Sequence, residues 1–232
     1  TGRAVMDLIE RGVTARQIVT EASLRNALAV DVSLGGSTNA VLHLLAIAQE
    51  AEIDLTMADV GKVSAETPHL TKLSPAGPAH MQDLDQAGGI QVVMKEIERV
   101  LDTSQVGING KTVAENIAAT GKTNGKVVKP WAEAYSPTGG LSVLFGSLAP
   151  DGAAVKSHAV DPKMLRHRGP ARVFNGEEPA TKAIMSQDFE AGDVIVVQGE
   201  GPRGGPGMRE MLSLTAMISG MGMDDRVALL TD

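Results

Sequence analysis

The residues best suited to chemistry lie in a glycine-rich stretch, GEGPRGGPGMREML, over residues 199–212. Glycines and two prolines crowd its first nine residues, and Glu210 stands where a helix-forming run begins. Glycine lacks a Cβ, so a loop of this kind leaves backbone N–H groups accessible to a ligand. A fixed carboxylate beside such a loop suits Mg²⁺, which takes one or two carboxylates plus substrate oxygens. We therefore interpret Glu210 as a candidate metal ligand.

Two other interpretations of this stretch compete with a metal site. A strand at 193–198, the loop, a helix and a strand ending in Asp232 are similar to a dinucleotide-binding unit. Gly205 and Gly207 fit the first two glycines of that motif, but its third glycine position holds Glu210, which would repel a pyrophosphate. The simplest alternative is that Glu210 complements the helix dipole, an effect of about 0.3–1 kcal/mol. A Walker loop is excluded because no Lys-Ser/Thr pair follows the glycines.

A second candidate site is the motif GGSTN at residues 35–39. Ser37, Thr38 and Asn39 open a strongly apolar helix, whose free N–H groups could hold an anion. The alternative is ordinary N-capping combined with helix packing. Both interpretations stay open at this point.

Composition and charge exclude several classes of function. The 232 residues are 43% hydrophobic and carry a formal net charge of −7 with no basic block, so nucleic acid is a poor partner. The longest apolar stretch, at 40–48, is half of the roughly 20 residues that a membrane span needs, and it contains His43. There is no cysteine, so this chain alone cannot form a disulfide or bind an iron–sulfur cluster through thiolates.

The hydrophobic pattern predicts helices first and strands later. Thr20 is the expected N-cap of a helix over 20–34, and Thr56 and Asp59 are expected to form a capping box at the start of another helix. Helices are predicted over 20–34, 35–53, 88–101, 177–186 and 208–219, and strands over 141–148, 153–156, 171–174, 193–198 and 226–230. We therefore predict an α+β fold. His43 is interpreted as a packed or boundary histidine.

A shift in composition near residue 125 predicts two domains. Residues 1–125 are expected to be mostly helical, and residues 126–232 to be a β-rich small barrel or mixed sheet. The chain starts at Thr1 without Met and ends in a strand-like run with no finishing turn. We therefore expect it to be a segment of a longer protein.

Several long strings carry a resemblance to a known family. They are EGPRGGPGMREML with VALLTD, LGGSTNAVLHLLAIAQEAEIDL at 34–55, MQDLDQAGG at 81–89, GSLAPDGAAVK at 146–156 and GPARVF at 169–174. In this order they resemble the dihydroxy-acid, phosphogluconate and sugar-acid dehydratase family, along essentially the whole chain. Within that family, STNAVLHLLAIA and MREMLSLTAMISGMGM look most like the branched-chain amino-acid dehydratases.

The resemblance implies both a fold and a reaction. The fold would be the helical tail of an N-terminal α/β domain, followed by a swivelling β-barrel-like domain flanked by helices and incomplete at its C-terminus. The reaction would convert 2,3-dihydroxyisovalerate and 2,3-dihydroxy-3-methylvalerate to 2-keto acids in valine and isoleucine synthesis. Family members use an iron–sulfur cluster as Lewis acid, a nearby Mg²⁺ and a serine base.

The resemblance also assigns roles to positions of this sequence. Glu210 occupies the position of a Mg²⁺ ligand. The cluster cysteines lie in an upstream region absent here, and the base serine would follow Asp232, so this chain contains no catalytic residue and is expected to be inactive alone. The candidates for the wall of the substrate or cluster cavity are Ser37, Thr38, Asn39, Gly204, Gly205 and Gly207.

The family further implies a cytoplasmic homodimer that acts on a small-molecule dihydroxy acid, with no nucleic-acid or membrane partner. Two alternatives remain. One is a sugar-acid dehydratase with the same chemistry. The other is a binding or scaffold module that has no catalytic activity.

Overall fold

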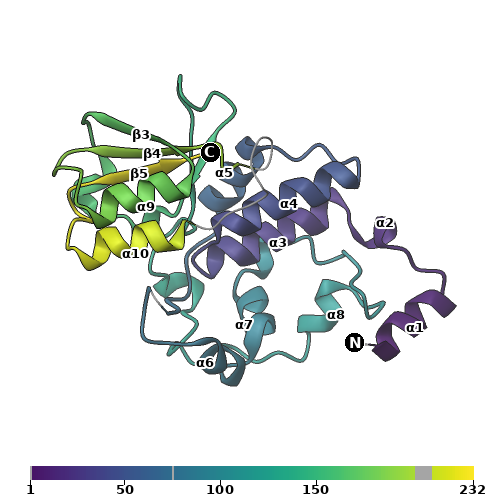
Figure 1. Cartoon of the computed structure of the whole chain (residues 1–232). Helices are drawn as coiled ribbons and strands as arrows, with labels where there is room; N and C mark the ends of the chain where they lie inside the picture. Colours follow the sequence, from purple (N-terminus) through teal and green to yellow (C-terminus); the bar gives the residue numbers. More distant parts are fainter. Residues whose placement is uncertain (1, 75, 202–210) are drawn as a thin grey trace. The chain divides into compact units, whose positions relative to one another are not determined.

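The computed structural model describes residues 2–74, 76–201 and 211–232 (Figure 1). The chain divides into two compact units, Thr1–Ala159 and Val160–Asp232. Helices are combined with an antiparallel strand pair in the first unit and a parallel three-stranded sheet in the second, so the predicted α+β fold is confirmed. Among the described residues, no helix has the length and hydropathy needed to cross a membrane.

The first unit is built mainly from helices. They are α1 (Gly2–Glu10), α2 (Ala15–Ile18), α3 (Glu21–Ser33), α4 (Thr38–Glu50), α5 (Met57–Glu66), α6 (Met81–Gln86), α7 (Gly89–Glu96) and α8 (Val113–Ile117), with short 3₁₀ segments at Glu98–Val100, Trp131–Glu133 and Ser157–Ala159. Strands β1 (Ser142–Leu144) and β2 (Ala153–Val155) pair as an antiparallel hairpin. The predicted segments at 20–34, 35–53, 88–101, 141–148 and 153–156 all contain the expected element.

Capping residues start the helices where the sequence predicts. Thr20 precedes α3, and its side chain accepts a hydrogen bond from Ser23 N–H at 3.0 Å. Thr56 and Asp59 form the predicted capping box at the start of α5. Each cap satisfies N–H groups that have no partner inside the helix.

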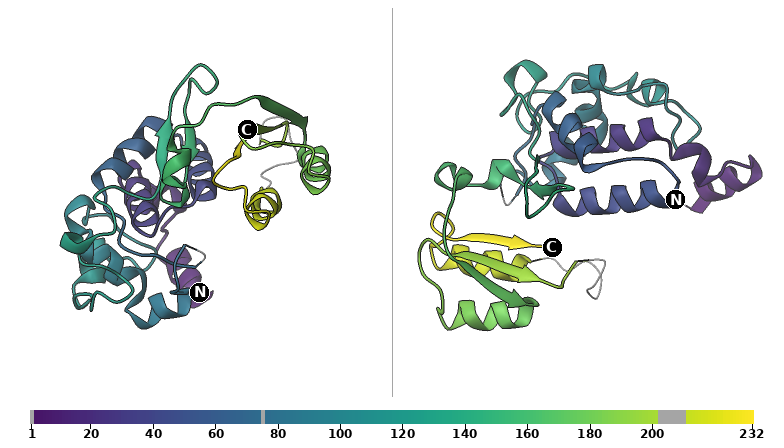
Figure 2. Two further views of the ribbon diagram at one scale, coloured as in Figure 1. Left: turned by 90° about the vertical axis from the view of Figure 1, so that its left-hand side faces the viewer. Right: turned by 90° about the horizontal axis from the view of Figure 1, so that it is seen from above.

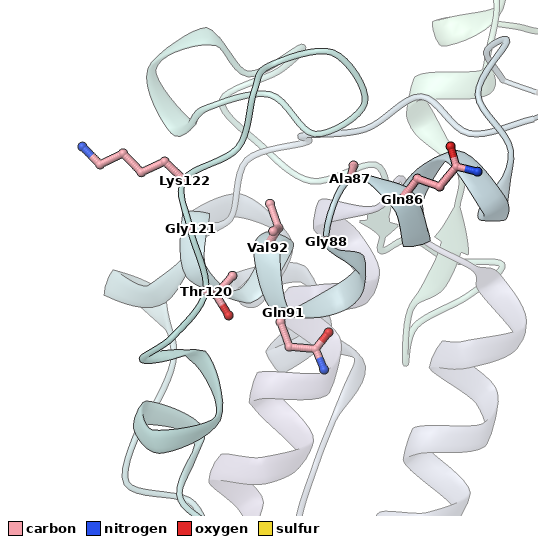
Figure 3. Close-up of a pocket in the computed structure, with 8 residues that line it drawn as sticks. All are labelled: Gln86, Ala87, Gly88, Gln91, Val92, Thr120, Gly121 and Lys122. Carbon is pink, nitrogen blue, oxygen red and sulfur yellow. The ribbon is translucent and has the colours of Figure 1, made fainter.

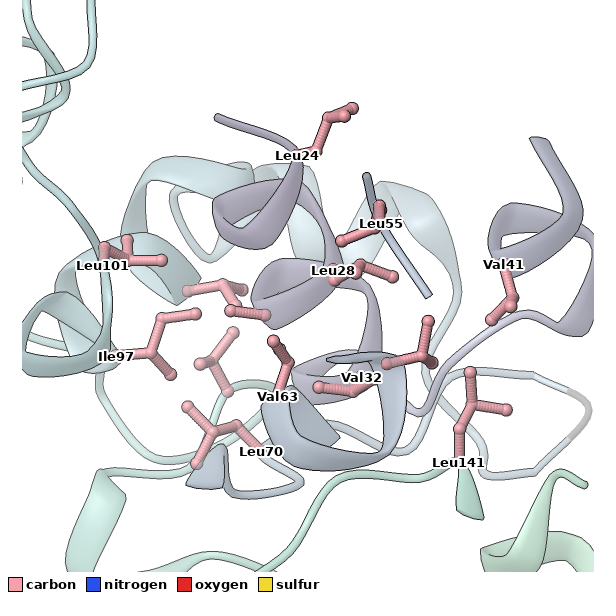
Figure 4. Close-up of a cluster of buried hydrophobic side chains, with 14 of the residues drawn as sticks. Leu24, Leu28, Val32, Val41, Leu55, Val63, Leu70, Ile97, Leu101 and Leu141 are labelled. Atoms are coloured by element: carbon pink, nitrogen blue, oxygen red, sulfur yellow. The ribbon is translucent and has the colours of Figure 1, made fainter. Parts of the chain in front are cut away.

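Helix α3 is the centre of the first hydrophobic core. Its residues Leu28 and Val32 are fully buried and lie among aliphatic side chains from α5, α7 and the loops that follow them (Figure 4). The buried set comprises Leu24, Leu28, Ala29, Val32, Val41, Ala48, Leu55, Val60, Val63, Leu70, Leu84, Val92, Val93, Ile97, Leu101, Val128 and Leu141. Aliphatic packing of this kind is what a chain with 2% aromatic residues can provide.

The segment after residue 125 returns to the helices of the first unit. Gly140 N–H donates to Val32 O at 3.0 Å, Gly139 N–H donates to Ser64 O at 2.8 Å, and the buried Ser64 hydroxyl donates to Leu141 O at 2.6 Å. These bonds join the β1–β2 hairpin to α3 and α5. The compact unit therefore extends to Ala159, and the domain division at 125 stays a prediction.

The second unit contains a parallel sheet with strand order β3 (Ala171–Asn175), β4 (Val194–Gln198), β5 (Ala228–Thr231). Helices α9 (Glu177–Met185) and α10 (Leu212–Gly220) connect these strands and lie on one face of the sheet (Figures 1 and 2). Their side chains enclose a second core of Ala180, Ile184, Ile195, Val197, Leu214, Ile218 and Val227. The strands do not close into a barrel within the described residues.

His69 is a buried polar residue in the first unit. Its side chain is 2% exposed, and its Nε2 has no hydrogen-bond partner among the described residues. Burial, together with the nearby His158, Lys72 and Lys156, lowers the pKa of His69 from 6.5 to about 4, although a hydrogen bond to the Thr71 backbone opposes the shift. The folded protein therefore holds His69 as a neutral imidazole.

The burial of His69 predicts a specific dependence of stability on pH. Between pH 6.5 and about 4 the unfolded chain binds a proton at His69 that the folded chain does not. Stability therefore rises with pH in this window, and the free energy of unfolding should fall by about 1.4 kcal/mol per pH unit as the pH decreases. Urea unfolding at a series of pH values measures this slope. His69→Leu should flatten it, whereas His43→Gln, which alters an exposed histidine, should keep it. An unchanged slope in His69→Leu would show that His69 is not its source.

Candidate functional site

The glycine pair before α4 lies very close to Gly140 and Leu141, and a side chain at this contact would overlap its neighbours. Gly35 and Gly36 are buried, with φ of +117° and +78°. A Cβ on Gly36 would overlap the side chain of Leu141, and a Cβ on Gly140 would overlap the carbonyl of Gly35. Positive φ and the absence of a Cβ are both properties of glycine, so the sequence GG is required by this turn.

Ser37 acts as the N-cap of α4. Its hydroxyl accepts a hydrogen bond from Ala40 N–H at 3.4 Å, and its own N–H donates to Asp31 Oδ2 at 3.1 Å. Burial raises the pKa of Asp31, which the bond from Ser37 and the charge of Lys156 only partly offset. Ser37 is therefore an N-cap, as one of the two interpretations expected. In the first turn that follows, Thr38 is exposed and Asn39 is half-buried. A direct role for the three residues in a cavity stays a prediction.

Two histidines face the glycine pair. The rings of His69 and His158 lie 4.6 Å apart between centroids, and the place where a Cβ of Gly35 would stand is 3.2 Å from His69 Nε2 and 3.5 Å from His158 Nε2. His158 Nδ1 is 3.0 Å from Gly140 O, which it contacts as a hydrogen-bond donor. No sequence signal marks either histidine, because they are 89 residues apart and no spacing rule connects them.

The described part of the glycine loop is anchored by Asp232. Gly199 N–H donates to Asp232 Oδ2 at 2.8 Å, and the N–H groups of Glu200 and Gly201 donate to Oδ1 at 3.1 Å each. Although burial raises the pKa of Asp232, these three hydrogen bonds and one from the backbone of Asp232 itself outweigh the effect of burial, and the pKa lies below its usual value. Because β4 and β5 are parallel neighbours, their carboxyl ends bring the loop and this carboxylate together.

This anchoring argues against the dinucleotide interpretation. The strand–loop–helix–strand order is present, as β4, α10 and β5. The first N–H groups of the loop, however, already bind a carboxylate and are not available to a phosphate. Asp232 itself is turned onto the loop, so it does not serve as the free acid that would bind a ribose.

A further loop residue, Glu200, binds the start of α9. Glu200 is buried, and its Oε1 accepts a hydrogen bond from Glu177 N–H at 2.8 Å. Glu177 Oε1 in turn accepts a bond from the Ser213 hydroxyl at 2.6 Å. Glu177 therefore links α9 to α10. The predicted site residues Gly204, Gly205, Gly207 and Glu210 lie outside the described residues.

The described residues do not by themselves form a metal centre. Among them, no three His, Asp or Glu side chains are grouped so that they could hold a metal ion, and the sequence has no cysteine. An open depression of about 450 Å³ lies between α7 and the segment after α8 and contains none of the predicted site residues (Figure 3). It is lined by Gln86, Ala87, Gly88, Gln91, Val92, Thr120, Gly121 and Lys122.

Helix α4 departs from the sequence expectation at His43. The side chain was expected to be packed or at a boundary, but it is exposed. It lines a groove between α2 and α4, because the face of α4 that carries it has no covering element within the described residues. Another histidine, His80, lies at the N-cap position of α6, where its backbone N–H donates to Asp83 Oδ2 at 2.7 Å.

Comparison with known proteins extends along the whole chain. Residues 1–116 match the family model described as dihydroxy-acid/6-phosphogluconate dehydratase N-terminal, and residues 126–232 match the corresponding C-terminal model. Relatives named dihydroxy-acid dehydratase are 51% identical in Moorella thermoacetica, 49% in Dehalococcoides mccartyi and 51% in Carboxydothermus hydrogenoformans, each over 100% of this chain. The chain spans 42% of the length of each of these relatives. It belongs to the dihydroxy-acid/6-phosphogluconate dehydratase family.

Proposed function

We propose that this chain is part of a dihydroxy-acid dehydratase of valine and isoleucine synthesis. The full protein would remove water from 2,3-dihydroxyisovalerate and 2,3-dihydroxy-3-methylvalerate to give 2-keto acids. The observation that carries the proposal is the identity of about half of all residues, over the whole chain, with relatives that bear this name. A cytoplasmic homodimer, as the family resemblance implies, is part of the same proposal.

The proposed reaction needs groups that this chain does not contain. An iron–sulfur cluster and Mg²⁺ would supply Lewis acidity toward the leaving hydroxyl and the developing enolate. The cluster ligands and the base serine would come from other parts of the protein. The described residues alone would not hold either the cluster or Mg²⁺. Glu210 is proposed as the one Mg²⁺ ligand from this chain.

The chain's own contribution is to position two glycine-containing segments. Asp232 accepts hydrogen bonds from the first N–H groups of the loop that leads to Glu210. Asp31 accepts the N–H of Ser37 at the start of α4. Both carboxylates act on backbone, so they fix the loops without using the side chains proposed to meet the substrate. Gly204, Gly205 and Gly207 are proposed to let the substrate approach the backbone.

Ser37 provides a test of the site at α4. In the full-length enzyme, Ser37→Ala should lower the free energy of unfolding by about 1 kcal/mol, the usual cost of a lost cap. If Ser37 also lines the cavity, kcat/KM should fall by at least about tenfold, which corresponds to 1.4 kcal/mol of lost transition-state stabilisation. Urea unfolding and steady-state keto-acid assays measure the two quantities separately.

Thr20→Ala is the matched control for Ser37. It removes the N-cap of α3, with a similar stability cost, at the end of that helix opposite to Asp31. Its kcat/KM should stay at the wild-type value. Equal kcat/KM values for the two variants would leave Ser37 with a capping role alone.

Activity itself separates the proposed function from its alternatives. The full-length protein should release keto acid from 2,3-dihydroxyisovalerate with a higher kcat/KM than from gluconate, arabinonate or 6-phosphogluconate. The isolated 232-residue chain should release none. A preference for a sugar acid would contradict the proposed substrate, and keto-acid release by the isolated chain would contradict the need for outside groups.

A further inference from the structure

Three asparagines of this chain are followed directly by glycine: Asn109, Asn124 and Asn175. In an Asn-Gly pair the glycine nitrogen can attack the side-chain carbonyl carbon of the asparagine, because glycine has no side chain to hinder the approach. All three asparagines are exposed, so access of water does not distinguish them. They differ in how the folded chain holds the two nitrogens that take part in this reaction.

Asn109 and Asn124 begin the same tripeptide, Asn-Gly-Lys, and make the same local turn. Asn109 Oδ1 accepts a hydrogen bond from Lys111 N–H at 3.1 Å, and Asn124 Oδ1 accepts one from Lys126 N–H at 3.0 Å. A donor on this oxygen stabilises the negative charge that develops there when the carbonyl carbon is attacked. This bond therefore favours the attack in both turns.

The departing side-chain nitrogen separates the two turns. Asn109 Nδ2 donates to Asn116 Oδ1 at 2.6 Å, so the amide of Asn109 is held at both ends. The amide of Asn124 is held through its oxygen, and its Nδ2 makes no hydrogen bond with the described residues. The NH₂ group of Asn109 must give up a hydrogen bond before it leaves, whereas that of Asn124 need not.

The attacking glycine nitrogen differs as well. Gly110 N–H donates to the backbone carbonyl of Gly107 at 2.9 Å. Gly125 N–H instead donates to the Thr123 hydroxyl at 3.1 Å. Rotation of the Thr123 side chain to another rotamer releases Gly125 N–H without moving the backbone, although it also ends the bond of that hydroxyl to Val128 O. The nitrogen of Gly125 is therefore the more easily freed of the two.

Asn175 is held by the parallel sheet. It is the last residue of β3, and its Oδ1 accepts a hydrogen bond from Gln198 Nε2. The nitrogen that would attack it, that of Gly176, donates to Gln198 O at 2.9 Å. Both reacting groups are therefore tied to the end of β4.

We propose that Asn124 is the site at which this protein deamidates. Gly125 N loses its proton to solvent and bonds to Asn124 Cγ, while the Cγ–Nδ2 bond breaks and Nδ2 takes up a proton to leave as ammonia. The product is a five-membered cyclic imide, which water opens to aspartate or isoaspartate. A negative charge is thereby added to the loop that follows α8. The proposal is independent of the proposed function, because the reaction uses only this loop and water.

Peptide mass spectrometry of the full-length protein tests the proposal. Folded protein and protein unfolded in urea are incubated together at mildly alkaline pH, and conversion at each asparagine is followed by its mass gain. In urea the three should convert at similar rates, because each precedes glycine. In the folded protein Asn109 and Asn175 should convert at least about tenfold more slowly than in urea, whereas Asn124 should stay within about threefold of its unfolded rate. Isoaspartate should form beside aspartate at residue 124.

Gly125→Ala tests the attacking group. Its Cβ has room, since the nearest atom is Pro130 Cδ at 3.7 Å, although the φ of +73° strains any residue other than glycine. The added methyl group should slow conversion of Asn124 at least about tenfold and leave Asn109 at its wild-type rate. If this variant fails to fold, the wild-type comparison of folded and unfolded protein still decides.

Three results would overturn the proposal. One is folded protein in which Asn124 is protected as strongly as Asn109 and Asn175. Another is aspartate without isoaspartate at residue 124, which would indicate direct hydrolysis instead of a cyclic imide. The third is an unchanged rate in Gly125→Ala, which would show that Gly125 N is not the attacking group.

Discussion

One carboxylate organises the second unit around its glycine loop. Asp232 follows β5 and accepts three N–H groups from the residues that follow β4. Because glycine has no side chain to make contacts, Gly199 and Gly201 are held through their backbone N–H groups. Parallel pairing of β4 with β5 brings the carboxylate to these N–H groups, so one contact joins the end of β5 to the described start of the loop.

The first unit holds its glycine turn in place by close packing. The turn before α4 has Gly35 and Gly36 pressed against Gly140 and Leu141, and Asp31 accepts the N–H of Ser37. His69 lies beside this turn as a neutral imidazole, because burial and neighbouring cations oppose its protonation. In both units an acidic side chain therefore binds backbone N–H groups next to a glycine turn.

Local signals were enough to predict the elements but not their contacts. The cap at Thr20, the box at Thr56 and the apolar periodicity of 171–174 and 193–198 were correctly interpreted, because each depends on residues a few positions apart. The contact of Asp232 with Gly199 and that of His69 with His158 join distant residues, and no sequence period encodes them. His43 was misjudged for a related reason: an apolar helix predicts burial, but in the described structure His43 is exposed and lines the groove between α2 and α4. Glu210 and the glycines 204, 205 and 207 lie outside the described residues.

The central claim is that the Asp232 carboxylate holds the start of the glycine loop. Amide hydrogen exchange of Gly199, Glu200 and Gly201, followed by NMR in wild type and in Asp232→Ala, tests it most directly. The account predicts that exchange of these three amides becomes at least about tenfold faster in the variant, while the amides of Ile195 and Val197 in β4 keep their protection. Unchanged exchange at the three loop amides would contradict it.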